Sequence, residues 1–316
     1  MKKLLSMACI AALAAGACVG ATGSPDSVPD GRLPVVATNS ILGEFVTIVG
    51  GERVALRILV GPQGDAHEFE PSPADAAAIA EAAILFENGL GFEPWLDDLY
   101  AAADSGAVRV VATDGSVRLP AADLSGRGGT EDGPGELSQV DPHVWQDVTN
   151  AMRMVENVRA ALLAADPSHT DVYATNVDAY LDQLAELDAW VRQQVEKLPA
   201  ARRLLVTSHD TFGYFAARYG FDVIGTALGG TTAGLADPSA GAIAELVEAI
   251  KAAGVPAIFA ENVSNPGLMR QIAAEAGVEL APPLYTDALG EPGSAGDTYV
   301  KMIRYNVSTI VDALSK

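Results

Sequence analysis

Three of the four histidines in this chain stand in short loops rich in glycine, proline and aspartate. His67 lies in Gly-Asp-Ala-His-Glu-Phe-Glu-Pro-Ser, His143 in Asp-Pro-His-Val-Trp, and His209 in Ser-His-Asp-Thr-Phe-Gly-Tyr-Phe. Neutral imidazole is the commonest metal ligand in proteins. A carboxylate from the segment 284–290, Leu-Tyr-Thr-Asp-Ala-Leu-Gly, would complete a tetrahedral set suited to Zn²⁺. Together these residues indicate a metal site, although a single histidine usually has a structural or surface role.

The elements that must position these loops follow a β-α-β pattern from Leu33 onward, in which short β-branched runs alternate with amphipathic segments. The first half contains expected strands at 35–38, 54–60, 83–86 and 108–112, and expected helices at 41–49, 73–81 and 94–103. In open α/β sheets, the carboxyl ends of the strands face the binding crevice. His67 and His143 from one lobe are therefore expected to meet His209 from a second lobe.

A long helical pattern separates the two halves. It begins at Asp166-Pro167-Ser168, continues with apolar residues every three or four positions, and ends at Pro199. His169 falls in its first turn, where a solvated surface role is expected. The second half then contains expected strands at 204–206, 221–224, 256–260 and 278–281. Its expected helices are 210–219, one capped by Asp237-Pro238 and ending at 253, 266–276 and 295–314.

This order predicts an α/β fold of two lobes with mostly parallel sheets flanked by helices. One long rigid helix joins the lobes, and the metal site lies in the cleft between them. The expected boundaries are an N-terminal lobe at 33–165, a linking helix at 166–199 and a C-terminal lobe at 200–316. Residues 119–140 match neither the helix nor the strand period, and they predict a mobile acidic loop in the first lobe.

The N-terminus has the features of an export signal. Residues 1–17 join a basic start to an apolar run that ends in small residues, and Cys18 follows directly. A cysteine at this point is typical of a lipoprotein that is acylated there, although Ala15-Gly16-Ala17 also suits plain secretion. Residues 18–32 then read as a flexible tether. We expect the mature protein outside the cytoplasmic membrane, either lipid-anchored or periplasmic.

Charge and composition exclude several classes of protein. The chain has 316 residues, a formal net charge of −21 and 49% hydrophobic residues. The hydrophobic content excludes a disordered or fibrous chain. The negative charge opposes binding to nucleic acids and to anionic membranes, so membrane contact is expected only through a lipid anchor.

The four motifs, in this order, resemble those of the metal-binding solute-binding lipoproteins of bacterial ABC importers for zinc and manganese. The resemblance covers about residues 35–314. It implies that His67, His143, His209 and Asp287 are the metal ligands. It also implies a monomer that captures the ion and delivers it to an ABC permease with its ATPase, and a metallochaperone is a conceivable further partner.

Within this family, His at the third position is commoner in zinc binders and Glu in manganese binders. His209 therefore favours Zn²⁺, and Mn²⁺ stays open because Asp287 could bind through both oxygens. The loop 119–140 contains no histidine, unlike that of many zinc importers. Since imidazoles must be neutral to bind metal, we expect affinity to fall below about pH 6.5.

Residues that could orient the ligands are also suggested by position. Glu261 follows an expected strand of the second lobe, where the family has an equivalent acid, and Asn39 and Ser40 follow the first strand. Each of the three could instead be a helix cap or a loop residue. Trp145 and Phe212 are expected to pack in the wall of the cleft.

Two other classes of function, a zinc hydrolase and an adhesin, have less support in the sequence. A zinc hydrolase needs an open coordination position and a general base. The sequence has neither His-Glu-x-x-His nor Gly-x-Ser-x-Gly, so the chain is not expected to be an enzyme. A role in cell adhesion is conceivable for a surface lipoprotein, but the sequence marks no partner patch.

Overall fold

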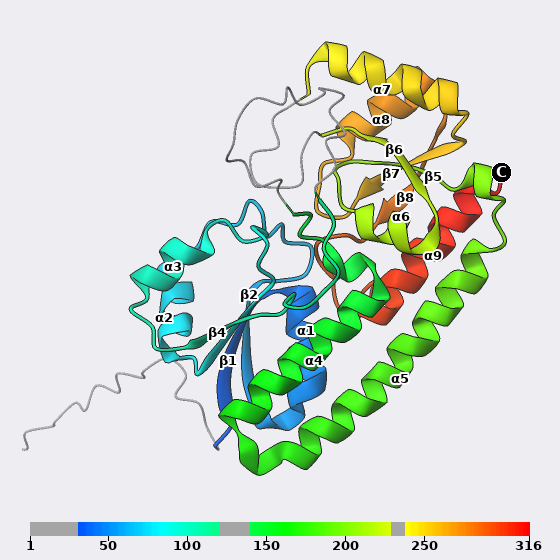
Figure 1. Ribbon diagram of the computed structural model, residues 1–316. Helices are drawn as coiled ribbons and strands as arrows, with labels where there is room; N and C mark the ends of the chain where they lie inside the picture. The colour runs from blue at the N-terminus through cyan, green and yellow to red at the C-terminus, as the bar shows by residue number, and fades with distance from the viewer. Residues whose placement is uncertain (1–30, 121–139, 229–237) are drawn as a thin grey trace, which may run out of the picture.

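The computed structural model describes residues 31–120, 140–228 and 238–316 (Figure 1). The expected signal segment 1–17, Cys18 and nearly all of the tether 18–32 lie outside the described residues. So does the loop 119–140 except for its ends, where Pro120 and Val140 form an antiparallel bridge. No helix in the described ranges is long and apolar enough to cross a membrane.

The N-terminal lobe is built on a parallel four-stranded sheet in the order β2-β1-β3-β4. Its strands are β1 (Leu33–Asn39), β2 (Val54–Val60), β3 (Ile84–Glu87) and β4 (Val108–Val111). Its connecting helices are α1 (Ser40–Gly50), α2 (Pro73–Glu81) and α3 (Leu96–Ala102). β1 is buried along its second half because helices cover both faces of a parallel sheet, as the β-branched run predicted.

A further helix of this lobe, α4 (Val148–Ala165), was not anticipated. Its N-cap Asp147 accepts a hydrogen bond from the Thr149 N–H, as expected for a carboxylate at this position. Its buried residues recur at helical spacing, with Ala151, Val155, Val158 and Leu162 facing the core. The helical period of α4 is therefore present in the sequence, directly before the longer pattern of the linking helix.

The linking helix α5 (Thr170–Val195) has 26 residues and follows a 3₁₀ turn at Pro167–His169. Its buried side chains follow the predicted three-or-four spacing from Tyr173 to Val195. α5 packs against α1 and α4 of the first lobe and against α9 of the second, so it lies along both lobes (Figure 1). His169 stands at its start and contacts Asp166 at 2.6 Å.

The C-terminal lobe contains two parallel strand pairs, β5-β6 and β7-β8, with β5 beside β7. Its strands are β5 (Leu204–Thr207), β6 (Asp222–Thr226), β7 (Ala257–Glu261) and β8 (Glu279–Leu284). Its helices are α6 (Gly213–Tyr219), α7 (Ala240–Ala253), α8 (Gly267–Ala276) and α9 (Tyr299–Leu314). The predicted α/β fold with parallel sheets and one long helix is confirmed.

All four helices of this lobe begin later than predicted, α8 by one residue. α7 is capped by Ser239, whose hydroxyl accepts from the Ala242 N–H, and Asp237 of the expected Asp237-Pro238 cap lies outside the described residues. α9 begins at Tyr299 because Thr298 caps it, four residues after the predicted start. α6 begins at Gly213, since the residues after His209 form a loop.

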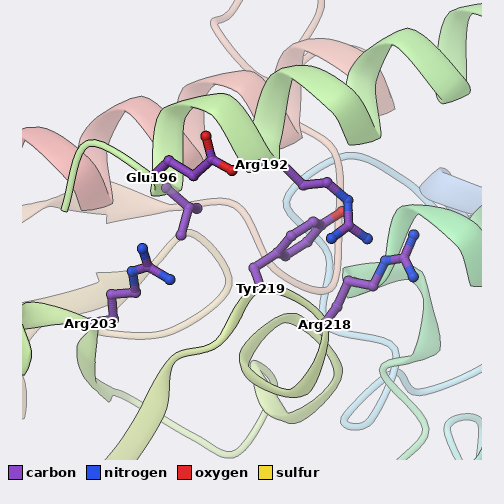
Figure 2. A pocket seen from close by; sticks show the side chains of 6 residues that line it. Arg192, Glu196, Arg203, Arg218 and Tyr219 are labelled. Carbon is purple, nitrogen blue, oxygen red and sulfur yellow. The ribbon is translucent and has the colours of Figure 1, made fainter. Parts of the chain in front are cut away.

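A cavity of about 140 Å³ lies where α5 meets α6, lined by Arg192, Val195, Glu196, Arg203, Arg218 and Tyr219 (Figure 2). Its arginines bind protein acceptors. Asp188 accepts from Arg192 and Arg218, and the Leu198 carbonyl accepts from Arg203. This junction joins the linking helix to the second lobe and includes none of the candidate metal ligands.

Candidate metal-binding site

Four side chains from distant parts of the sequence converge between the lobes. One donor atom from each of His67, His143, His209 and Asp287 lies within 4.8 Å of all the others, and all four residues are buried. The Nε2 atoms of His67 and His143 are 3.3 Å apart, and the His209 Nε2 is 3.0 Å from the Asp287 Oδ2. Three imidazole nitrogens and one carboxylate therefore face a common centre.

His67 lies in the loop after β2 and is positioned within its own lobe. The Asp65 carboxylate accepts a hydrogen bond from the His67 backbone N–H at 2.8 Å. The indole of Trp95 donates to the carbonyl of Ala66, the preceding residue, at 2.7 Å. The His67 Nδ1 is buried and has no hydrogen-bond partner among the described residues, so its ring is held mainly by packing against Phe92.

His143 directly precedes the 3₁₀ turn η2 (Val144–Gln146), and Asp141 binds it at two points. The Asp141 Oδ1 accepts from the His143 backbone N–H at 2.9 Å and contacts the ring Nδ1 at 2.8 Å. The contact at Nδ1 leaves Nε2 to face the centre. A carboxylate on the outer nitrogen fixes the ring and strengthens the inner nitrogen as a donor.

His209 follows β5 and is held by Glu261, the last residue of β7. The Glu261 carboxylate contacts the His209 Nδ1 at 2.5 Å. It also accepts from the backbone N–H groups of Ser208 and His209 at 2.9 and 3.1 Å. The neighbouring strand thus supplies the orienting group.

Asp287 lies in the segment after β8. Hydrogen bonds to the N-terminal lobe hold this segment in place. The Gln63 N–H donates to the Leu289 carbonyl at 3.0 Å, and the Leu289 N–H donates to the Ser40 hydroxyl at 2.9 Å. The Trp145 indole donates to the Thr286 carbonyl at 2.9 Å. Three hydrogen bonds between the lobes therefore position the segment that carries this carboxylate.

The three residues that were expected to orient the ligands have different roles in the structure. Glu261 contacts His209 directly. Ser40 acts two residues away from Asp287, through Leu289, whereas Asn39 caps α1 by accepting from the Leu42 N–H at 2.9 Å. Asp141 was missed, although it stands two residues before His143, the spacing that Asp65 has to His67. This repeated Asp-x-His spacing was the available signal.

Burial and the charges within the cluster together set the pKa of each group. Burial lowers the pKa of His67 to about 3. Burial would also lower the pKa of His209, but Glu261 and Asp287 outweigh it and raise that pKa well above its ordinary value. The pKa of His143 is raised because Asp287 and Asp141 likewise outweigh burial. The histidines hold the pKa of Asp287 well below its usual range despite burial. The carboxylates of the cluster therefore favour positive charge at its centre, as a bound cation would supply.

The donor chemistry fits a divalent cation. Within the described residues, the buried His209 Nε2 and Asp287 Oδ2 make no hydrogen bond of good geometry, although the two atoms are 3.0 Å apart. Buried polar atoms without such partners are costly, and a cation at their centre would satisfy both. Because the four donors are all protein atoms, they would complete a tetrahedral shell without a bound water.

Comparison with known proteins identifies the family of the chain. A family model described as "Zinc-uptake complex component A periplasmic" matches residues 35–313. The chain is 35% identical to the manganese-binding lipoprotein MntA of Halalkalibacterium halodurans, over 97% of this chain and 96% of that one. It is also 34% identical to the zinc-binding protein TroA of Treponema pallidum, over 98% of each chain.

Solved structures are similar over the same range. The periplasmic zinc-binding protein TroA superimposes with a TM-score of 0.79 at 30% identity, covering 90% of this chain and 100% of that one. A manganese-bound periplasmic metal-binding protein from Candidatus Liberibacter asiaticus has a TM-score of 0.77 at 26% identity, with the same coverage. The similar proteins thus include binders of both metals.

Proposed function

Because this chain belongs to the zinc-uptake component A family of periplasmic metal-binding proteins, we propose that it captures Zn²⁺ through His67, His143, His209 and Asp287. The protein is the extracytoplasmic substrate-binding component of a metal ABC transporter. The observation that carries the zinc proposal is the convergence of three buried imidazole nitrogens and one carboxylate. The ion is the cargo, and the protein's chemistry is coordination.

Zinc is supported by the type and number of donors. Zn²⁺ binds imidazole nitrogen at about 2.0 Å and is usually four-coordinate in closed sites. Asp141 and Glu261 hold the outer nitrogens of two of the three rings, which favours strong nitrogen donors. Manganese prefers oxygen ligands and a higher coordination number.

Manganese is the second candidate, and a specific observation favours it. Both Asp287 oxygens face the cluster, since Oδ1 lies 3.6 Å from the His143 Nε2 and Oδ2 lies 3.8 Å from the His67 Nε2. A carboxylate that binds through two oxygens would raise the coordination number toward the preference of Mn²⁺. MntA, a manganese-binding lipoprotein by name, is also 35% identical to this chain.

The decisive experiment is a competition titration of metal-stripped protein with Zn²⁺ and Mn²⁺ against chromophoric chelators. The matched pair is His209→Ala and His169→Ala, because His169 is the histidine outside the cluster. We expect tight 1:1 zinc binding that His209→Ala weakens strongly and His169→Ala leaves unchanged. Comparable manganese affinity, despite the intrinsic advantage of zinc, would reassign the cargo to Mn²⁺. Tight binding of neither ion would overturn the metal site.

Delivery requires a membrane partner. Substrate-binding components of this class hand their cargo to a permease that works with an ATPase, and we propose that this chain does so for its metal. The family consists of transport proteins. A hydrolase would need an open coordination position, which four protein ligands would not leave. Acylation of Cys18 is proposed as the anchor, in keeping with relatives named as lipoproteins.

A further inference from the structure

Two of the chain's three tryptophans hold the peptide carbonyl immediately before a candidate ligand. Trp95 donates to the Ala66 carbonyl, which precedes His67, and both residues belong to the first lobe. Trp145 donates to the Thr286 carbonyl, which precedes Asp287 in the second lobe. Only the second of these hydrogen bonds therefore crosses between lobes.

Trp145 is connected to three of the four candidate ligands. It stands two residues after His143, and its ring packs edge-on against the His143 ring at 5.5 Å between centroids. Its indole reaches Thr286, whose hydroxyl donates to Glu261 at 3.2 Å, and Glu261 contacts His209. Asp287 follows Thr286 in the chain.

The second lobe also holds Trp145 through its backbone. The Tyr299 hydroxyl, at the start of α9, donates to the Trp145 carbonyl at 2.6 Å. Trp145 is 1% exposed, so water does not compete for either hydrogen bond. Loss of the indole N–H would leave the buried Thr286 carbonyl without this donor.

We propose that Trp145 is a positioning residue, whose indole N–H fixes Asp287 against His143 across the lobe interface and thereby slows metal release. The inference rests on the proposed function, in which these residues bind the metal. Movement of the segment that carries Thr286 and Asp287 away from Trp145 would break this hydrogen bond, so the bond opposes a separation of the lobes at the site. The Trp145 ring also packs against Phe92 and His143, in keeping with the packing role predicted for it.

The test compares Trp145→Phe with Trp190→Phe. Phenylalanine keeps an aromatic ring and removes the indole N–H, and Trp190, which lies on α5 beneath the Arg304 guanidinium, is the matched control. Metal release from loaded protein into excess chelator is followed by stopped flow. Groups that orient ligands typically contribute 10–100-fold in affinity, so we expect release about tenfold faster from Trp145→Phe and unchanged from Trp190→Phe.

Melting of the metal-free and metal-loaded forms separates positioning from general stability. A positioning role predicts that Trp145→Phe reduces the rise in Tm caused by metal, whereas a purely structural role lowers both Tm values equally. Tyr299→Phe, which removes the donor to the Trp145 carbonyl, is expected to speed release in the same direction. If the wild type binds metal tightly and both tryptophan variants release it at the same rate, the positioning role of Trp145 is overturned and the proposed function stands. Absence of tight binding by the wild type would overturn the proposed function first.

Discussion

His67 and His209 belong to the same cluster, yet the groups around their outer ring nitrogens differ. The His209 Nδ1 contacts the buried carboxylate of Glu261, whereas the His67 Nδ1 has no partner among the described residues. Burial therefore dominates at His67 and lowers its pKa to about 3, while carboxylates outweigh burial at His209. The contrast predicts that burial favours the neutral form of His67, whereas the carboxylates beside His209 favour its protonated form.

The largest expected effect tests whether both rings are equally necessary. His67→Ala and His209→Ala should each lower zinc affinity by more than about 100-fold, because groups that only orient ligands already contribute 10–100-fold. Chelator competition measures both constants. An affinity of His67→Ala within about threefold of wild type would remove His67 from the ligand set.

The raised pKa of His209 predicts that metal binding depends on pH. Since its pKa is raised, affinity should fall by up to about tenfold per pH unit as pH drops below that pKa, and the fall should begin above the value of about 6.5 expected from sequence. Calorimetry in buffers of different ionisation enthalpy would count the protons released. Binding at pH 7 without proton release would contradict the contrast between the two rings.

Removing the charge beside His209 should weaken the site less than removing the ring. Glu261→Gln is expected to lower zinc affinity by about 10–100-fold and to shift the pH dependence downward, because the carboxylate no longer favours imidazolium. Asp141→Asn makes the parallel change at His143. Unchanged pH dependence in Glu261→Gln would show that Asp287 alone raises the pKa of His209.

The smallest expected effect concerns folding stability at the lobe interface. Glu44 of α1 accepts from the Tyr299 N–H at the start of α9, and burial raises the pKa of Glu44 to about 7. The folded protein therefore holds this proton more tightly than the unfolded chain. The resulting stability is complete below about pH 4.5, and it is lost as pH rises to about 7.

Glu44→Gln should abolish this loss of folding stability with rising pH. Relative to wild type, the free energy of unfolding of the metal-free variant should increase by roughly 1–3 kcal/mol between pH 5 and pH 8. Urea denaturation at several pH values measures the difference, with the exposed Glu52→Gln as the control. A difference that does not change with pH would show that Glu44 is ionised throughout.

Local pattern was sufficient to predict much of the fold. β2 and α2 lie at the predicted residues, because a β-branched run and a Ser-Pro start with a capping Asp75 are local signals. The starts of α7 and α9 were placed too early, because Ser239 and Thr298 are the caps and other polar residues nearby carry the same local signal. The start of α6 was placed too early because the residues after His209 form a loop. A single short-range hydrogen bond decides where a helix begins, whereas many residues decide that a helix forms. The predicted ends of helices were therefore less accurate than their predicted presence.

The sequence by itself determined which side chains could bind a metal and that their loops follow strands. It could not decide how each donor is oriented. Asp65 and Asp141 stand at the same spacing before a histidine, yet only Asp141 contacts the ring nitrogen. Trp145 and Thr286 are 141 positions apart, and their hydrogen bond forms only because one lobe packs against the other. Donor type is a property of the residue, whereas donor orientation depends on contacts between distant segments, so the tertiary structure alone decided it.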